Sequence, residues 1–469
     1  MPGWLRPPKV GKAASRTMFS PLCASSSDAL RFRYMKSRTT VRGTPTASAI
    51  LPDGTMIELV YQPDGERTLL AAYQDDKVTF HETMEMPSGE RLVPIAAQNN
   101  LIRHHAVLLP EQPDEYGSVA ELVDEIETYL RRYVDLSPAF FGIATHYILL
   151  SWVYDAFNEL PYLRLRGEPG SGKTRALIVI GSLCYKGFLA SGASTVSPIF
   201  HTLDTFRGTF IFDEADFRFS DEKAELVKIF NNGNVRGFPV LRTAISAKRE
   251  FDPQAFMVFG PKIVAMRHAF EDRALESRFI TEEMGQRPMR PDIPINLPDI
   301  QQAEARALRN KLLMYRFQTL GTVQVDVGLV DPTLSSRLNQ ILVPLLSIID
   351  DEQVRANIAA AARTLDRTLR SERAATPEAQ LLEVLTEVLA DSTRNAVPFA
   401  EITQSFAIRF GAEFERPITP RYLGSLLRTR LHLASYKTRG VYVVPVSEKS
   451  KVDALCPRYG VTIYPPTAG

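Results

Sequence analysis

The chain has 469 residues, 45% of them hydrophobic, which suffices for several buried cores and predicts two to four domains. Its 55 Lys and Arg residues balance 54 Asp and Glu, so the charge excludes a global positive field, and any basic surface must be local. Three scattered cysteines, Cys23, Cys184 and Cys456, exclude a disulfide framework and favour a reducing, cytoplasmic setting. No apolar run is long enough to predict a membrane span.

Residues 1–44 form a basic leader, in which many Lys and Arg residues stand against one acid, Asp28. The leader is either a basic arm for nucleic acid or a disordered segment before a later start at Met18 or Met35, and the second interpretation is favoured. Residues 45–114 predict a small β-rich domain, because Pro-Asp-Gly turn signals separate apolar runs. Its neighbouring histidines, 104 and 105, lack a third ligand at a metal-binding spacing.

Two helices are expected next. Residues 118–121 form a capping box that begins a helix ending near Val134. Ser137 and Pro138 begin a second helix that ends near Phe157. The apolar bulk of the second helix predicts that it packs against the domain that follows.

A glycine-rich loop of the form G-x-x-x-x-G-K-T follows, between a strand-like run at 161–166 and a helical run at 175–183. The loop residues are Gly167, Glu168, Pro169, Gly170, Ser171, Gly172, Lys173 and Thr174. Glycines let backbone N–H groups crowd around phosphate oxygens, and a helix N-terminus attracts the same anion. The pattern predicts an ATP or GTP site, in which Lys173 reaches the β- and γ-phosphates and Thr174 ligates Mg²⁺. A structural glycine-rich turn is the alternative.

A buried apolar strand at 208–212 ends in Asp213 and Glu214, beyond a strand and a helix predicted within 187–203. This is the Walker B arrangement, in which Asp213 holds Mg²⁺ and Glu214 orients or deprotonates the attacking water. A glutamate beside the aspartate indicates active hydrolysis rather than a slow switch.

A long β-hairpin is predicted at 239–259, before a core strand at 262–266. Two strand-like runs flank a polar, basic stretch that holds Lys248 and Arg249. In ring ATPases that move nucleic acid, such a hairpin carries basic residues to the phosphates. Arg242, Lys248 and Arg249 are therefore candidate DNA contacts, although an ordinary surface hairpin fits the residues equally well.

An arginine that follows the 262–266 strand is a candidate arginine finger. Such a guanidinium reaches from one subunit to the γ-phosphate of its neighbour and stabilises transition-state charge. Arg273 and Arg278 are both candidates, and a salt-bridged surface arginine is the alternative.

These motifs resemble those of AAA+ ATPases, nearest to the branch of superfamily III and MCM-like helicases and to bacterial phage or plasmid primase/helicase-like proteins. The resembling segments lie within residues 115–350, at 167–174, 210–214, 237–259 and 272–279. The triplet at 277–279 is similar to the finger motif of MCM-like and clamp-loader ATPases, which favours Arg278. The sequence departs from the family at the end of the fourth strand, where Arg267 follows in place of the usual Asn or Thr sensor.

The resemblance implies an α/β P-loop core over residues 115–300, a homo-hexameric ring, ATP, Mg²⁺ and a DNA substrate. Helical apolar spacing at 300–318 and 334–350 suits the small lid that follows an AAA+ core, here residues 301–372. Arg337 is a candidate second sensor on the γ-phosphate, and a surface charge is the alternative.

Residues 373–469 predict a winged helix, with three helices followed by a hairpin at 436–445. Basic residues on the third helix and in the hairpin suggest contact with duplex DNA. They are Arg421, Arg428, Arg430, Lys437 and Arg439. Winged helices also serve as protein-contact modules, so that alternative remains.

The favoured hypothesis is an ATP-dependent DNA motor, a hexameric replication helicase of a mobile element, with a single strand in its channel and a replication or loader protein as a further partner. One alternative is an AAA+ regulator or remodeller that acts on a protein partner and uses the winged helix to find DNA. Another is a clamp-loader-like switch with slow hydrolysis.

Overall fold

The computed structural model describes residues 43–213, 221–245, 251–270, 272–390 and 394–461. Three predicted site residues, Glu214, Lys248 and Arg249, lie outside these ranges, as does the basic leader up to residue 42. No helix in the described ranges is both long enough and apolar enough to cross a bilayer.

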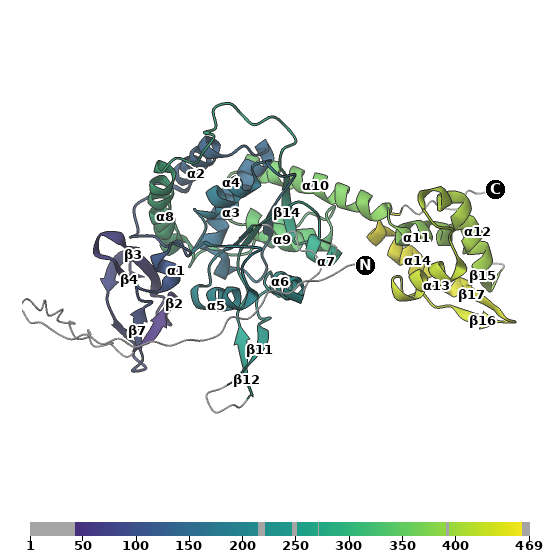
Figure 1. Cartoon of the computed structure of the whole chain (residues 1–469), viewed down its shortest axis with the longest axis horizontal. Coiled ribbons are helices and arrows are strands. Elements are labelled where there is room, and N and C mark those ends of the chain that lie inside the picture. Colours follow the sequence, from purple (N-terminus) through teal and green to yellow (C-terminus); the bar gives the residue numbers. More distant parts are fainter. Residues whose placement is uncertain (1–42, 214–220, 246–250, 271, 391–393, 462–469) are drawn as a thin grey trace, which may run out of the picture. The chain divides into compact units, whose positions relative to one another are not determined.

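A five-stranded parallel sheet forms the centre of the nucleotide-motif region (Figure 1). Its spatial order is β14 (Phe279–Glu283), β8 (Tyr162–Arg166), β13 (Lys262–Met266), β10 (Phe210–Asp213) and β9 (Phe188–Ser191). The strands predicted at 161–166, 187–190, 208–212 and 262–266 are confirmed. The sequence patterns did not predict β14, an edge strand in which two of the five residues, Glu282 and Glu283, are of a type depleted in strands.

Alternate residues of these strands enter two separate hydrophobic cores, since successive side chains in a strand point to opposite faces. On one face, Leu163, Ile211 and Ile263 pack with α2 (Val119–Tyr133), α3 (Pro138–Trp152) and α4 (Lys173–Gly181). On the other face, Phe210 and Val264 pack with α5 (Val196–Phe206) and α6 (Asp221–Asn232). The sheet is therefore covered on both sides, as a parallel sheet requires.

The N-terminal strands add to both of these cores rather than enclosing one of their own. The antiparallel order is β2 (Ser48–Ile50), β3 (Met56–Gln62), β4 (Arg67–Gln74) and β5 (Lys77–His81), and β1 (Thr44–Thr46), β7 (Arg91–Pro94) and β6 (Met84–Glu85) form a second small sheet. Val60 and Leu69 join the first core, whereas Ile57 and Leu70 join the second. After α1 (Asn100–Arg103), residues 106–108 pair with the edge of β9.

Buried charges hold this N-terminal sheet in place. The Glu58 carboxylate on β3 is 2% exposed and lies 2.7 Å from both Lys186 Nζ and Arg316 Nε. Arg316 also forms an ion pair with Asp155 at 2.7 Å, and Tyr185 donates its hydroxyl to Glu58. Burial by itself would raise the pKa of the Glu58 carboxyl, but Lys186 and Arg316 hold it below its ordinary value. Four segments far apart in the sequence meet at this cluster.

The helices expected around the motifs are present, but the prediction that α3 ends near Phe157 is wrong. It ends at Trp152, because Val153 leaves the helical conformation (φ −123°, ψ 17°) and a short 3-10 turn follows. Ser118 and Glu121 form the predicted capping box of α2, and the Ser137 side chain caps α3. In the predicted lid, α8 (Ile300–Thr319) and α9 (Ser336–Leu346) contribute to the first core together with α2 and α3, and α10 (Glu352–Ala374) follows.

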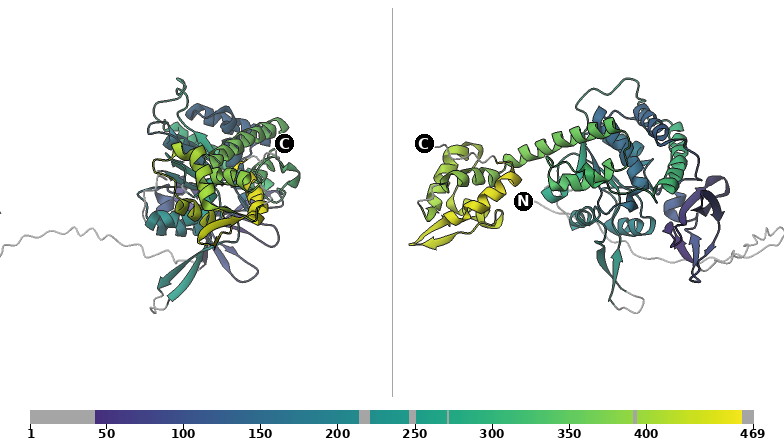
Figure 2. Two further views of the ribbon diagram at one scale, coloured as in Figure 1. Left: turned by 90° about the vertical axis from the view of Figure 1, so that its right-hand side faces the viewer. Right: turned by 180° about the vertical axis from the view of Figure 1, so that it is seen from behind.

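The predicted hairpin is confirmed, with β11 (Val240–Ile245) paired antiparallel to β12 (Phe251–Phe256). These strands pair only with each other among the described residues. The hairpin extends away from α5 and α6 in all the views of Figures 1 and 2.

The C-terminal segment has a hydrophobic core of its own. It contains α11 (Pro377–Val388), α12 (Phe399–Phe410), α13 (Pro420–Thr429) and α14 (Lys449–Leu455). A three-stranded antiparallel sheet has the order β15 (Ala396–Pro398), β17 (Val441–Pro445) and β16 (Tyr436–Thr438). Arg439 and Gly440, both with positive φ, form the tight turn between β16 and β17.

Replacing Glu58 with Gln is expected to destabilise the chain by about 3–5 kcal/mol, because Lys186 would be left buried without its counter-charge, whereas Arg316 keeps Asp155. Glu85→Gln is the matched control, since the Arg91–Glu85 pair is exposed and should contribute under about 1 kcal/mol. Chemical denaturation measures both changes. Equal losses for the two variants would contradict this account of the buried cluster.

Acid should destabilise the chain through His146, which is 4% exposed on α3 and contacts the Gly142 carbonyl at 2.8 Å. Burial lowers the pKa of His146 below its ordinary 6.5. The unfolded chain therefore binds the proton first as pH falls, so this stability is complete above pH 6.5 and is lost below it. Unfolding free energies of wild type and His146→Gln should diverge by up to about 1.4 kcal/mol per pH unit below that value. Parallel pH profiles would refute the assignment.

Candidate active site

The glycine-rich loop leaves the carboxyl end of β8 and enters α4 at Lys173. Hydrogen bonds connect this part of the chain to the ends of both strands beside β8, which are β13 and β14. The Gly167 N–H donates to the Met266 carbonyl at 3.3 Å, and the Met284 N–H donates to the Arg166 carbonyl at 2.6 Å. Gly172, the residue before α4, has φ of 87° and Gly170 has φ of 81°, backbone conformations that L side chains rarely adopt. The glycine spacing of the motif is thus required by the loop's path.

Lys173 folds back over the loop. Its ammonium donates to the carbonyls of Gly167 at 2.6 Å and Glu168 at 2.8 Å. Ser171, in contrast, has a buried hydroxyl oxygen without a hydrogen-bond partner in the described structure. A buried polar atom of this kind is costly unless a ligand or water satisfies it. A cation and an unsatisfied hydroxyl in one glycine-rich loop suit an anionic ligand.

The loop meets the predicted Walker B strand through one hydrogen bond. The Thr174 hydroxyl donates to Asp213 Oδ2 at 2.8 Å, although β13 separates β8 from β10 in the sheet. A hydroxyl and a carboxylate oxygen are ligands that Mg²⁺ accepts. The pair therefore fits the expected magnesium site. Strand β13 lies between β8, which leads into the loop, and β10, which ends at Asp213. Arg267 is the residue that follows β13.

A cavity of about 580 Å³ lies beside the loop, a volume that would accommodate a nucleotide-sized ligand. Its walls include apolar residues from separate parts of the chain, namely Val134, Met284, Met289 and Ile293. Asp135 and Arg287 also line it and form an ion pair at 3.2 Å. Arg175, on α4, donates to the carbonyls of Pro294 and Ile295, which ties the segment after β14 to the loop helix.

Sequence motifs did not reveal this cavity wall. The segment after β14 matches no phosphate or metal pattern, and Asp135 belongs to no predicted motif. The available signal was weak, a Gly-Gln-Arg-Pro turn at 285–288 in which Gly285 has φ of 81°.

Arg278 lies at the opposite edge of the sheet from the loop of its own chain. It directly precedes β14, which runs parallel to β8 with Phe279 beside Tyr162, so a strand length of roughly 15 Å separates it from that edge. It is 8% exposed and donates to Asn231, Asn234 and the Ala274 carbonyl. Burial lowers the pKa of Arg278, and the nearby charge of Arg337 lowers it further.

The other two predicted arginines, Arg337 and Arg273, each lie at the start of a helix. Arg337, on the first turn of α9, lies within electrostatic range of Arg278 and is not among the residues that line the 580 Å³ cavity. Arg273 is the first residue of α7 (Arg273–Glu276). The two finger candidates are therefore close in the sequence, and Arg337 lies near Arg278.

Of the predicted DNA contacts, Arg242 already has partners within the chain. It forms an ion pair with Glu225 and lies 4.5 Å from the centre of the Phe200 ring. The C-terminal candidates are exposed. Arg421 and Arg428 lie on α13, Arg430 is the C-cap residue of that helix, and Lys437 and Arg439 lie on the β16–β17 hairpin. Tyr442, which is 53% exposed, brings two of these cations together, with Arg428 at 6.0 Å and Lys437 at 5.9 Å from its ring.

Comparison with known proteins finds no matching family model and no matching curated protein. Among solved structures, the chain resembles the NrS-1 C-terminal region, at 12% identity and a TM-score of 0.36, over 83% of this chain and 96% of that one. It also resembles SCCmec type IV Cch, described as an active helicase, at 12% identity and a TM-score of 0.34, over 87% and 99%. A JCV helicase matches at 14% identity and a TM-score of 0.23, over 54% and 62%.

These likenesses are distant, with TM-scores of 0.36 or lower. The assignment of the site therefore rests on features of this chain, which are its parallel sheet, its glycine-rich loop and the bond between Thr174 and Asp213.

Gly167→Ala should damage the loop, because an added Cβ would lie 2.6 Å from the Met284 carbonyl and 2.8 Å from Ser171 Oγ. Relieving that contact must shift backbone between β8 and β14, with an expected cost of about 1–3 kcal/mol. Gly142→Ala is the control, since nothing lies within 4 Å of its added Cβ and alanine favours the helix. Thermal unfolding should separate the two variants, and equal midpoints would argue against the tight loop geometry.

Proposed function

We propose that the chain is an ATP-dependent DNA motor of the AAA+ helicase type. The observation that carries the proposal is the 2.8 Å hydrogen bond between Thr174 at the glycine-rich loop and Asp213 at the end of β10. Two strands that are not neighbours bring a hydroxyl and a carboxylate together at one edge of a parallel sheet, beside a cavity of about 580 Å³. In open α/β sheets, ligands bind outside the carboxyl ends of the strands.

Within this site the loop binds the phosphates of ATP. The Lys173 ammonium exchanges the carbonyls of Gly167 and Glu168 for the β- and γ-phosphate oxygens, and the unpaired Ser171 hydroxyl gains a partner. Thr174 and Asp213 would hold Mg²⁺, which supplies positive charge to the phosphates when bound. Glu214 orients the attacking water or removes its proton.

The proposal places ATP between subunits of a ring. Because Arg278 lies at the edge of the sheet away from its own loop, it can serve only the nucleotide of another copy. To do so it must leave Asn231, Asn234 and the Ala274 carbonyl, which hold it in the isolated chain. Arg337 lies near enough to contribute a second positive charge on the same side. Arg273 is the alternative candidate for the arginine finger.

DNA is the proposed substrate, on two surfaces. The β11–β12 hairpin, with Lys248 and Arg249 between its strands, would follow a single strand in the channel. The C-terminal helices and antiparallel hairpin, as a winged helix, would contact duplex DNA through Arg428, Lys437 and Arg439. Both contacts are mainly to phosphates, so binding should weaken steeply as salt rises.

The first test is the ATPase rate of the purified protein with and without single-stranded DNA, with Lys173→Ala as the blank. We expect several-fold stimulation by DNA in the wild type, because translocation couples hydrolysis to strand binding, and no hydrolysis in the variant. A forked duplex then tests unwinding.

Hydrolysis that is indifferent to every DNA would contradict the motor and favour the protein-remodelling alternative. A pull-down with Glu214→Gln would then identify the protein partner. Equal hydrolysis by Lys173→Ala would refute the site itself.

A further inference from the structure

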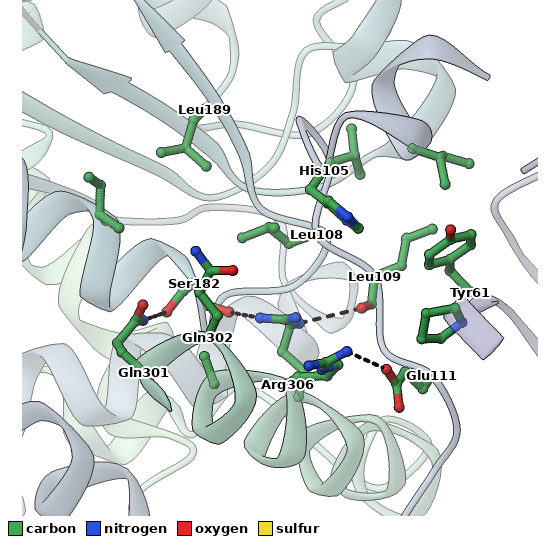
Figure 3. Close-up of a pocket in the computed structure, with 16 residues that line it drawn as sticks. Tyr61, His105, Leu108, Leu109, Glu111, Ser182, Leu189, Gln301, Gln302 and Arg306 are labelled. Carbon is green, nitrogen blue, oxygen red and sulfur yellow. Dashed lines mark hydrogen bonds and ion pairs between the residues drawn. The ribbon is translucent and has the colours of Figure 1, made fainter. Parts of the chain in front are cut away.

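A second cavity lies at the other end of α4 from the glycine-rich loop. Figure 3 shows the residues that line it. It has a volume of about 280 Å³, which suits a small molecule. Residues from four regions line it, namely Tyr61 and 102–111 from the N-terminal part, Ile178 and Ser182 from α4 and its end, Leu189 from β9, and 301–309 from α8. None of the predicted motifs includes these residues.

One wall of this cavity is cationic. Arg309 is 7% exposed, and its guanidinium donates to the carbonyls of Ser182 at 2.7 Å and Leu109 at 3.4 Å. Both partners are neutral, and no carboxylate lies at ion-pair distance from Arg309 among the described residues. Burial lowers the pKa of Arg309 to about 10, so it remains charged near neutral pH. Arg306, one turn earlier on α8, pairs with Glu111 at 3.0 Å (Figure 3).

The charge of the cavity is therefore not balanced by its own walls. Two arginines against Glu111 leave one positive charge, 2 − 1 = 1. The carboxyl end of α4, which Arg309 approaches through Ser182, offsets about half a unit. Gln302, which is exposed, adds a side-chain amide to the lining. A net positive, partly desolvated wall favours an anion.

Much of the remaining lining is apolar. Ile102, Val107 and Leu109 are buried, and Leu189 is 39% exposed on β9. Tyr61 and His105 complete this part of the lining with their rings in contact, with centroids 6.2 Å apart. An ion as small as phosphate would leave this apolar lining without a partner, whereas an apolar body attached to the anion would cover it.

We propose that this cavity is a second ligand site, which binds a small organic anion whose charged group lies at Arg306 and Arg309 and whose apolar body lies against Ile102, Val107 and Leu109. The charged group is a carboxylate or a phosphate ester, since both accept the same guanidinium donors. Binding at this site does not depend on the proposed motor function.

Ligand-observed NMR titrations of the full chain test the proposal with benzoate, phenyl phosphate and benzylamine as probes. The titrations use Lys173→Ala, so that the glycine-rich loop does not capture the phosphate. Benzoate or phenyl phosphate should bind with a dissociation constant of about 1 mM or tighter. Benzylamine, which has the same ring and a positive charge, should not bind. Which anion binds more tightly identifies the ligand as a carboxylate or a phosphate ester.

A pair of charge variants locates the binding. Gln302→Glu adds a negative charge to the lining and should weaken binding at least about tenfold. Ala303→Glu adds the same charge at the next exposed position, which does not line the cavity, and should change binding less than about twofold. Arg306→Gln is the second variant and should abolish binding.

Failure of both anions to bind at about 10 mM would overturn the proposal. So would equal weakening by Gln302→Glu and Ala303→Glu. Neither outcome bears on the ATPase measurement, because these titrations require no hydrolysis.

Discussion

The buried Glu58 carboxylate constrains the arrangement of the nucleotide-motif region. A charge that is 2% exposed must be compensated, and its two cationic partners come from segments more than a hundred residues away. Lys186 follows the loop helix α4 and Arg316 lies on α8, while Asp155, in the 3-10 turn after α3, balances the second cation. The N-terminal strands consequently pack into the cores of this region, and Tyr61 on β3 lines the second cavity. An independently folded module joined to this region would not need such compensation.

Because the central strands are parallel, the glycine-rich loop and the candidate arginine finger, Arg278, lie at opposite ends of the strands. All carboxyl ends lie at one edge, where the loop meets Asp213, and Arg278 stands at the start of β14 at the other edge. A rigid strand keeps these groups apart within one chain. The proposed mechanism therefore needs a neighbouring copy, and the hydrogen bonds that hold Arg278 to Asn231 and Asn234 would have to be exchanged when a neighbour's nucleotide arrives.

The two candidate DNA surfaces differ in whether their cations already have an ion-pair partner within the chain. Arg242, at the base of the hairpin, has a carboxylate partner and an aromatic neighbour, which makes a packing role as well supported as a DNA contact. In the C-terminal segment, Arg428 and Lys437 flank the exposed ring of Tyr442, and the positive φ of Arg439 places that residue at the tip of the turn. Exposed cations beside an aromatic ring are available for phosphates without first losing a buried partner.

The sequence by itself determined the features that depend on neighbouring residues. The glycine spacing of residues 167–172, the capping box at Ser118 and the basic turn at 439–440 each follow from local backbone requirements, and the structure contains all three. Only the tertiary structure decided which distant residues meet. Glu58, Met284 and Arg309 carry no local signal, because their roles arise from strand order and burial, and these depend on how the whole chain packs rather than on spacing along it.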